Sequence, residues 1–289
     1  MRDFQYLRPK SVTEAIDLMA EHSPGARWYA GGTDLLIQLR NHKLDLNYLI
    51  DIKGLPELRN EIAVSDDFVS IPAAATMSEI ALNRTIQKFY PALVDAVSVI
   101  GSVQIRNRAT IGGNICNASP AADTAPPLLV YGAQVKAQGK SGVRRIAIND
   151  FFVKSGETTL KDDELLLSIE LPAPKARTGA AHVRRTRRRG HDLASVTLCC
   201  LIDESPLVKF AYGSVGPRPV LVEDKSGTLA DQTSSEEAKN TIFESLFAGA
   251  SPSKTSMRAS PEYRVAMLRV LGERALDIAW RRLSGEEGR

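Results

Sequence analysis

The segment IRNRATIGGNICNASPAAD, at positions 105–123, decides how this sequence is interpreted. Its glycine pair, Gly112-Gly113, is expected in a tight loop between Thr110-Ile111 and Asn114, and a run of small residues follows and ends at Asp123. Glycine lets a ligand approach the backbone closely. The small side chains would leave backbone polar groups facing open space, and Asp123 would offer an acceptor to a ribose or an adenine group. The alternative is a turn whose small residues only permit close packing.

A second glycine pair, Gly31-Gly32, occurs in the segment AGGTDL at positions 30–35. It follows a predicted strand, and successive exposed amide N–H groups there would form a concave anion site suited to a diphosphate. Thr33 would add a hydroxyl donor. A single glycine pair of this kind is more often a simple turn. Two such pairs, in a chain without GxGxxG or GxxxxGK[ST], predict a dinucleotide site outside the Rossmann pattern.

The composition is that of an ordinary globular protein. Of the 289 residues, 43% are hydrophobic and 25% are charged, and the net charge is +3. No apolar run approaches the roughly 20 residues that cross a bilayer, and the N-terminus lacks the apolar core of a secretory signal. We therefore expect a soluble, cytoplasmic protein without a membrane partner. A mild positive charge does not by itself indicate nucleic acid.

Cysteines and histidines are few and scattered. The three cysteines, Cys116, Cys199 and Cys200, include no CxxC pair, and the four histidines show no metal-ligand spacing. An iron–sulfur cluster normally needs about four thiolates. We predict no disulfide framework, no metal site and no cluster in this chain, so an organic cofactor would carry any redox chemistry. Cys116 is predicted to be a small buried residue and not a redox thiol.

Hydrophobic periodicity and turn signals predict an α+β fold, because strands and helices mix without strict βαβ alternation. Ser11 with Glu14, and Thr76 with Glu79, form predicted capping boxes, and Pro91 opens a helix that Gly101 stops. A polar stretch is expected at about 223–236. The main expected strands are 27–30, 47–53, 68–71, 134–137, 143–148, 165–171, 181–186, 194–202 and 207–214, and the last helices are 236–248 and 262–283.

The rigid, polar segment Pro172-Ala173-Pro174-Lys175 is the best candidate for a domain boundary. We predict a first domain at 1–175, with lobes at about 1–55 and 56–175. A smaller α+β domain is expected at 176–289.

Both glycine segments resemble the FAD-binding subunit of the molybdenum hydroxylases. That family includes xanthine dehydrogenases, nicotinate dehydrogenase and carbon monoxide dehydrogenase. The 105–123 segment is long and specific, and the likeness runs the length of the chain, with 192–196 and 260–264 most similar to the xanthine dehydrogenase branch. The resemblance implies a two-lobed FAD-binding domain of the vanillyl-alcohol-oxidase and molybdenum-hydroxylase type, followed by a smaller C-terminal α+β domain.

The resemblance also implies which residues hold FAD. The loop from Trp28 to Leu35 would surround the diphosphate, and Thr110 to Asn114 would contact the flavin and diphosphate from the other side. Ile100 would line the pocket, and Leu166 would pack on the cofactor. The complete implied set is Trp28, Tyr29, Ala30, Gly31, Gly32, Thr33, Asp34, Leu35, Ile100, Thr110, Ile111, Gly112, Gly113, Asn114, Asp123, Leu166 and Arg184.

Two positions depart from the family pattern. Arg184 stands where the family usually has lysine, and a planar guanidinium changes that contact in kind. Pro72 stands where glycine is usual. Trp28 and Tyr29 flank the first glycine pair, where an aromatic ring packs either against adenine or in the core. No histidine lies in a motif for covalent flavin attachment, so we expect noncovalent FAD.

The implied function is electron relay, with no catalytic acid or base in this chain. In the family, a molybdenum cofactor in a large subunit hydroxylates the substrate. Electrons then pass through 2Fe-2S clusters of a small subunit to this FAD and on to NAD or another acceptor. We therefore expect a large and a small partner subunit, arranged as a dimer of heterotrimers. The sequence determines neither the organic substrate, nor the acceptor, nor the oligomeric state.

Two other functions stay open on the sequence alone. One is a self-contained FAD-dependent oxidase or reductase of the same fold. The other is a binding or scaffold protein that has kept the fold without flavin.

The strongest charge cluster is RRTRRR at positions 184–189. A site for single-stranded nucleic acid would also need aromatic stacking platforms, and none is interleaved here. We expect a strand whose alternate arginines face solvent or a partner subunit, with Arg184 as a candidate to turn toward the cofactor.

Overall fold

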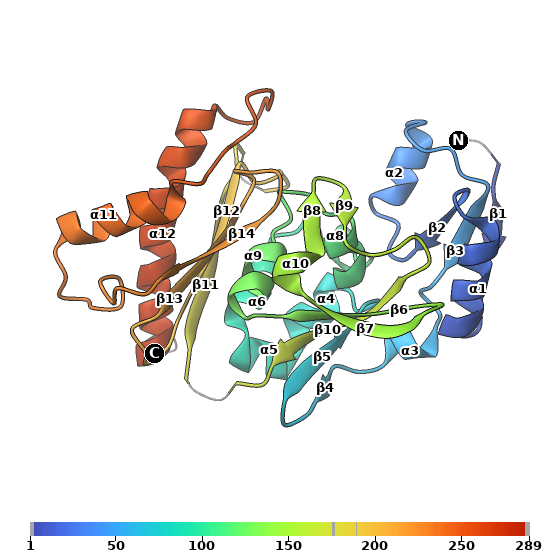
Figure 1. The fold of residues 1–289 in the computed structure, drawn as a ribbon, viewed down its shortest axis with the longest axis horizontal. Coiled ribbons are helices and arrows are strands. Elements are labelled where there is room, and N and C mark those ends of the chain that lie inside the picture. The colour runs from blue at the N-terminus through green and yellow to red at the C-terminus, as the bar shows by residue number, and fades with distance from the viewer. Residues whose placement is uncertain (1–2, 175–176, 189, 287–289) are drawn as a thin grey trace.

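The computed structural model describes residues 3–174, 177–188 and 190–286, and three parts follow one another along its longest axis (Figure 1). They are an N-terminal lobe, a central lobe and a C-terminal layer of sheet and helices. Two residues at the predicted boundary, Lys175 and Ala176, and Arg189 of the arginine run lie outside the described residues.

The N-terminal lobe is a small parallel sheet covered by a helix. Its strand order is β1 (Gln5–Leu7), β3 (Tyr48–Asp51), β2 (Ala26–Tyr29), and the helices are α1 (Val12–His22) and α2 (Leu35–Arg40). Ser11 caps α1, as predicted, by accepting from the Glu14 amide at 3.2 Å. The box is not reciprocal, because the Glu14 carboxylate accepts from the Lys10 amide at 2.7 Å instead.

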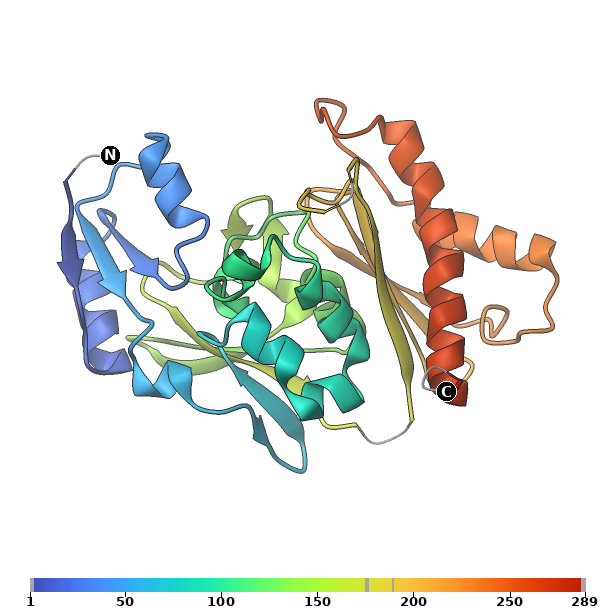
Figure 2. The ribbon, with the colours of Figure 1, turned by 180° about the vertical axis from the view of Figure 1, so that it is seen from behind.

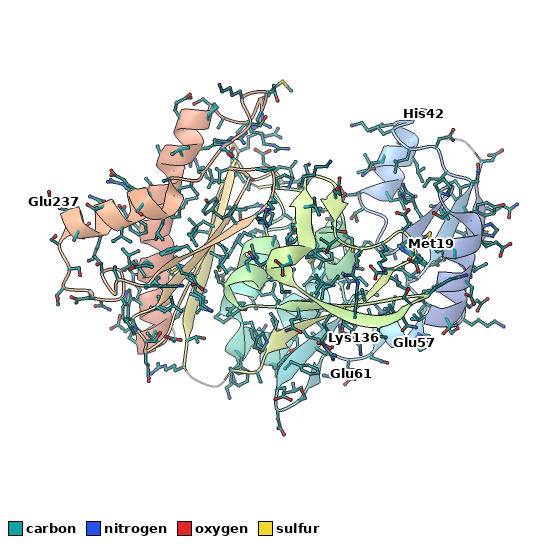
Figure 3. The ribbon with its side chains drawn as sticks, viewed as in Figure 1. Met19, His42, Glu57, Glu61, Lys136 and Glu237 are labelled. Atoms are coloured by element: carbon teal, nitrogen blue, oxygen red, sulfur yellow. The ribbon has the colours of Figure 1, made fainter. Side chains whose placement is uncertain are left out.

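The central lobe is built on an antiparallel sheet of order β4-β5-β10-β6-β7. Glu57, labelled in Figure 3, accepts from the Val12 amide at 3.2 Å and so ties this lobe to α1. The predicted capping box of Thr76 and Glu79 is confirmed. The elements are α3 (Pro56–Arg59), β4 (Ala63–Val64), β5 (Phe68–Pro72), α4 (Met77–Leu82), α5 (Arg84–Phe89), α6 (Pro91–Ser98), α7 (Val103–Arg106), α8 (Ile111–Cys116), α9 (Ala125–Val130), β6 (Gln134–Gly139), β7 (Gly142–Ala147), α10 (Ile148–Phe151), β8 (Phe152–Lys154), β9 (Glu157–Thr158) and β10 (Leu165–Pro172).

The C-terminal part is a four-stranded antiparallel sheet, β11 (Gly179–Arg185), β12 (Val196–Ile202), β13 (Val208–Gly213) and β14 (Val220–Asp224), with α11 (Glu236–Phe247) and α12 (Pro261–Ser284). Helix α12 lies along one face of this sheet, and α6 and α9 lie against the other (Figures 1 and 2). The expected strands and both helices are confirmed. Strand β14, however, lies partly in the stretch expected to be only polar.

The sheet separates two hydrophobic cores, and β12 is buried along its whole length. Successive side chains of a strand point to opposite faces. Cys199 therefore belongs to the core shared with the central lobe, and Cys200 to the core under α12. All three cysteines are free thiols, as predicted. Among the described helices, none is long and apolar enough to cross a membrane.

Candidate functional site

The first glycine pair lies in the loop between β2 and α2, and both glycines are required by their surroundings. Gly32 has φ +74°, and a Cβ on it would lie 2.5 Å from Cε2 of Tyr29. A Cβ on Gly31 would lie 2.1 Å from the carbonyl oxygen of Arg108. Because Arg108 belongs to the 105–123 segment, Gly31 brings the two glycine-containing segments into backbone contact.

The amide N–H groups of this loop are open. Within the described residues, the N–H groups of Gly31, Gly32, Thr33 and Asp34 donate to no acceptor, and the Asp34 side chain does not cap α2. Gly31, Gly32 and Thr33 are partly buried and Asp34 is exposed. Successive unpaired amides around a positive-φ glycine are typical of an anion-binding concavity. The loop therefore fits the diphosphate of a dinucleotide.

The second glycine pair differs from what was predicted, because it lies in the first turn of helix α8 and not in a loop. Thr110 is the N-cap, and its hydroxyl oxygen accepts from the Gly113 amide at 3.1 Å. The Ile111 amide donates to the Ala75 carbonyl at 3.0 Å, and the Gly112 amide to the Ala73 carbonyl at 3.0 Å. These amides are already paired within the protein, so the prediction that this pair forms a second loop is wrong.

Each glycine of this pair has its own role. A Cβ on Gly112 would lie 2.7 Å from the carbonyl oxygen of Ala73, so this glycine lets α8 pack on the segment that follows β5. Gly113 is exposed, and a Cβ there would meet only the Thr110 hydroxyl, at 2.9 Å. Beside it, Asn114 is partly exposed, and its side-chain oxygen accepts from the Thr124 hydroxyl at 2.5 Å. The Gly113 surface of α8 therefore leaves backbone accessible to a flat ligand.

The small-residue run does not face open space, which corrects the prediction made for it. Ala118, Ala121 and Ala122 are buried, and the carbonyl of Pro120 accepts from the Ser214 amide at 2.6 Å. A Cβ on Gly213 would lie 2.7 Å from that same carbonyl oxygen. The small side chains allow the C-terminal sheet to approach the central lobe, which is the close-packing alternative.

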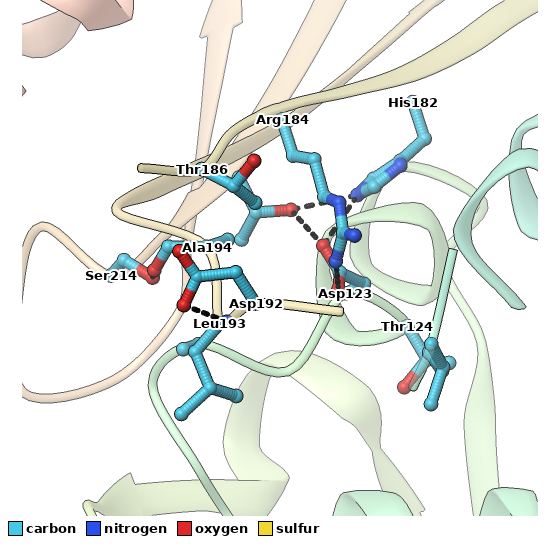
Figure 4. Close-up of polar contacts among 12 residues, drawn as sticks. Asp123, Thr124, His182, Arg184, Thr186, Asp192, Leu193, Ala194 and Ser214 are labelled. Carbon is cyan, nitrogen blue, oxygen red and sulfur yellow. Dashed lines mark hydrogen bonds and ion pairs between the residues drawn. The ribbon is translucent and has the colours of Figure 1, made fainter. Parts of the chain in front are cut away.

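Asp123, at the end of this run, is 6% exposed, and its carboxylate is already paired (Figure 4). Arg184 donates to Oδ2 at 2.8 Å, and the Thr197 hydroxyl donates to Oδ1 at 3.2 Å. Two residues predicted separately as cofactor contacts thus hold each other across the boundary between central lobe and C-terminal sheet. The carboxylate is not the open acceptor that the sequence suggested.

Sequence reasoning missed two members of this cluster, His182 and Thr197. His182 Nε2 lies 2.7 Å from Thr197 Oγ1, and both side chains are buried. Thr197 Oγ1 therefore lies within hydrogen-bonding distance of both His182 Nε2 and Asp123 Oδ1. The spacing of His182 and Arg184, two residues apart in one strand, is the signal that places them on the same face.

The other predicted contacts are spread over the central lobe and the N-terminal lobe. Ile100 follows α6 and is partly exposed. Leu166 is only 3% exposed and lies in the main core, whereas Leu167, at a bulge between Leu166 and Ser168, is partly exposed. Trp28 packs against the main core. For Leu166, the structure therefore places the side chain among protein neighbours.

The arginine run forms the end of β11 and the loop after it. Arg185 Nε donates to the Tyr263 hydroxyl at 2.8 Å. Arg187 and Arg188 lie 3.5 and 3.9 Å from the carboxylate of Asp192. The expectation of alternating arginines applies only up to Arg185, where the strand ends.

The thiol near the site is not a nucleophile, because burial raises the pKa of Cys116 to about 12. The thiol therefore stays protonated at neutral pH. Within the part of the chain that the structure describes, no group of three or more His, Cys, Asp or Glu side chains is placed to hold a metal ion.

Comparison with known proteins agrees with this geometry. Residues 2–174 match the family described as "FAD binding domain in molybdopterin dehydrogenase", and residues 181–279 match the "CO dehydrogenase flavoprotein C-terminal domain". The chain is 33% identical over 285 residues to the xanthine dehydrogenase FAD-binding subunit of Escherichia coli O157:H7, covering 96% of this chain and 97% of that one. It is 29% identical to the carbon monoxide dehydrogenase medium chain of Hydrogenophaga pseudoflava, covering 96% and 98%.

A solved structure of a CO dehydrogenase shares this fold. The structure of reconstituted CO dehydrogenase from Oligotropha carboxidovorans superposes with a TM-score of 0.90 at 26% identity, covering 97% of this chain and 99% of that one. Family matches together span both the FAD-binding region and the C-terminal sheet and helices. The chain belongs to the molybdenum hydroxylase family as its FAD-binding subunit, an oxidoreductase subunit of the xanthine dehydrogenase and CO dehydrogenase type.

Proposed function

We propose that this chain is the electron-transfer subunit of a molybdenum-containing hydroxylase, and that it holds FAD noncovalently between the Gly31-Gly32 loop and helix α8. The observation that carries this proposal is the row of four unpaired amides at Gly31–Asp34. Gly31 packs this loop against the backbone of the 105–123 segment. When bound, FAD would supply the redox chemistry, taking electrons from iron–sulfur clusters of a partner and passing them to NAD or another acceptor.

Each part of the site would have a separate task. The Gly31–Asp34 amides and the Thr33 hydroxyl would bind the diphosphate, in a loop flanked by Trp28, Tyr29, Ala30 and Leu35. The exposed backbone at Gly113, with Asn114 beside it, would face the flavin and diphosphate from α8. Thr110 and Ile111 would act indirectly, because their contacts begin the helix. Ile100 would line the flavin side of the pocket, and Leu166 would support it from the core.

Asp123 and Arg184 would contribute as a pair. Their ion pair leaves little net charge at the boundary between the central lobe and the C-terminal sheet, and the hydrogen bond from Thr197 fixes the carboxylate. A guanidinium has five donors, so Arg184 can bind Asp123 and still offer N–H groups to a ligand. In this arrangement Asp123 orients Arg184, and Arg184 would make the contact.

The proposed partners are a large molybdenum-cofactor subunit and a small 2Fe-2S subunit, with the complex a dimer of heterotrimers. Support comes from relatives named as subunits of larger enzymes, including a medium chain and a subunit of a dehydrogenase complex. This chain has three cysteines, fewer than the four thiolates a cluster normally requires.

The test uses the full chain. Purified protein is expected to show flavin absorbance in the visible range or to take up added FAD at one per chain. Gly113→Val places a branched side chain on the exposed backbone of α8 and should abolish FAD retention. Gly249→Val is the matched control, since a Cβ there would meet nothing within 4 Å.

A colourless protein that takes up no added FAD would contradict the proposal. Normal FAD retention by Gly113→Val would show that the cofactor does not approach α8. To test the relay, the chain is assayed alone and with its co-purifying subunits. Turnover of an organic substrate by the isolated chain would contradict a pure relay role.

A further inference from the structure

Basic side chains gather at one edge of the N-terminal sheet. Strands β1, β3 and β2 are parallel, so their carboxyl ends meet at the same edge. Arg8 follows β1, Lys53 follows β3, and the loop with the unpaired amides follows β2. Ligands of α/β sheets bind at the carboxyl ends of parallel strands.

Lys53 lies directly beside the loop. Its ammonium Nζ is 3.7 Å from the centroid of the Tyr29 ring, the same ring that a Cβ on Gly32 would strike. Asp51 Oδ1 accepts from Nζ at 2.5 Å, and Asp51 Oδ2 accepts from the Tyr6 hydroxyl. Asp51 therefore neutralises part of the charge of Lys53.

Arg108 approaches the same loop from the central lobe. Its carbonyl oxygen is the atom that excludes a side chain at Gly31. The residue is exposed, and within the described chain its guanidinium has no carboxylate partner. The charge of Arg108 also affects the pKa of Lys53. Desolvation lowers the pKa of Lys53, the nearby charges of Arg108 and Arg8 lower it further, and Asp51 acts in the opposite direction.

These groups leave positive charge that the protein itself only partly compensates. Four unpaired amides and the cations of Arg8, Lys53 and Arg108 lie around one loop. The carboxylates there are Asp51, which is paired to Lys53, and the exposed Asp34 of the loop itself. Like charges that are held close together repel, and a bound anion removes that repulsion. Net attraction for an anion is therefore expected at this edge.

We propose that Arg108 and Lys53 hold the diphosphate of FAD against the Gly31–Asp34 amides, with Asp51 limiting the strength of that attraction. This inference rests on the proposed function, in which FAD is the ligand. Because Arg108 comes from the central lobe and Lys53 from the N-terminal lobe, the diphosphate would also join the two lobes.

The experiment measures FAD dissociation constants by fluorescence quenching, using the full chain freed of flavin. Arg108→Gln is expected to weaken binding about tenfold, equivalent to about 1.4 kcal/mol. Lys53→Met should weaken it several-fold. Asp51→Asn should tighten it, because it removes the carboxylate paired with Lys53. Arg274→Gln, an exposed arginine of α12, is the matched control and should leave the constant unchanged.

FAD affinity at increasing NaCl concentration, and the affinity for riboflavin, test whether Arg108 acts through the phosphate charge. Screening weakens interactions between exposed charges, so FAD affinity of the wild-type chain should fall with added NaCl, and that of Arg108→Gln should fall less. Riboflavin has no phosphate, and its affinity should be the same in the wild type and in Arg108→Gln.

The outcomes separate the two proposals. A wild-type chain that binds no FAD overturns the proposed function. A wild-type chain that binds FAD, with Arg108→Gln and Lys53→Met unchanged in affinity and salt dependence, overturns this inference alone. Equal weakening by Arg108→Gln and Arg274→Gln overturns it as well, because the effect would then come from net charge. Weaker FAD binding by Asp51→Asn would contradict the proposal that Asp51 limits the attraction for the diphosphate.

Discussion

The two glycine pairs, Gly31-Gly32 and Gly112-Gly113, have the same dipeptide sequence in different hydrogen-bonding environments. After the first pair, the Asp34 side chain caps nothing, and four amides stay open. At the second pair, Thr110 caps a helix, and the first amides of that helix donate to Ala73, Ala75 and Thr110 itself. A glycine pair therefore predicts that another group approaches the backbone closely. The neighbouring caps decide whether that group belongs to a ligand or to the protein.

The two pairs also differ in what limits substitution. At Gly31 the obstacle is the backbone of another lobe, at Gly112 it is the backbone of the preceding strand segment, and at Gly113 it is a single hydroxyl. Backbone cannot move aside as cheaply as a side chain. The destabilisation expected below is therefore larger at Gly31 than at Gly112.

The largest effect is expected from Gly31→Ala. A Cβ 2.1 Å from the Arg108 carbonyl forces the two lobes apart, at a cost of about 3 kcal/mol, the upper end for overpacking. FAD retention should be lost with it. Urea unfolding and flavin absorbance provide the measurements, and a variant with wild-type stability would show that the lobes do not pack through this glycine.

Gly112→Ala tests the second pair in the same way. The new Cβ would lie 2.7 Å from the Ala73 carbonyl oxygen and 2.9 Å from its Cβ, so we expect about 1–3 kcal/mol of destabilisation. The FAD affinity of the protein that remains folded should change little, because this amide is paired internally. A selective loss of FAD without loss of stability would make the two pairs equivalent after all.

Thr110→Ala examines the cap that distinguishes the pairs. Removing the hydroxyl leaves the Gly113 amide without its acceptor, and loss of an N-cap costs about 1 kcal/mol. Thr110→Ser keeps the hydroxyl and serves as the control, with stability close to wild type. Equal unfolding midpoints for Thr110→Ala and wild type would show that α8 does not depend on this cap.

The smallest expected effect is a change in stability with pH that depends on Asp51, beside the first glycine pair. Burial raises the pKa of Asp51, but hydrogen bonds from Lys53 and Tyr6 lower it, and the net pKa lies below its ordinary value. A carboxyl with a lowered folded-state pKa stabilises the fold above its unfolded pKa. That contribution is lost as pH falls through the folded pKa.

We therefore expect the difference in unfolding free energy between wild type and Asp51→Asn to shrink as the pH falls below about 4, the unfolded pKa of aspartate. Its size should be under about 1 kcal/mol, as for partly exposed ion pairs. Unfolding at several pH values measures it. A difference that stays constant across this range would mean that the Lys53 pair does not stabilise the folded state.

Much of the fold follows from local patterns. Apolar runs predicted β10, β12 and β13, and side-chain caps predicted the start of α1 and α4. The short helix α8 was missed, because its six residues include two glycines, which disfavour helix. Its start depends on Thr110 together with two carbonyls that come from the segment after β5.

The predicted site residues show the same division. The residue types singled out two glycine-containing segments and Asp123, and the family resemblance added Arg184. Their sequence separation gave no indication that Asp123 and Arg184 bind each other, since their pairing requires the C-terminal sheet to pack on the central lobe. His182 and Thr197 enter the cluster for the same reason, through neighbouring strands β11 and β12.

The strand and helix pattern, the family, and the glycines where something must approach the backbone can all be predicted from the residues in chain order. The strands, helices and glycines follow from local propensity, capping and side-chain size. Which amides stay open and which charges are already paired follows from the packing of distant segments, because each answer depends on a partner far away in the chain. The open amides at Gly31–Asp34 and the closed ones at α8 differ for that reason alone.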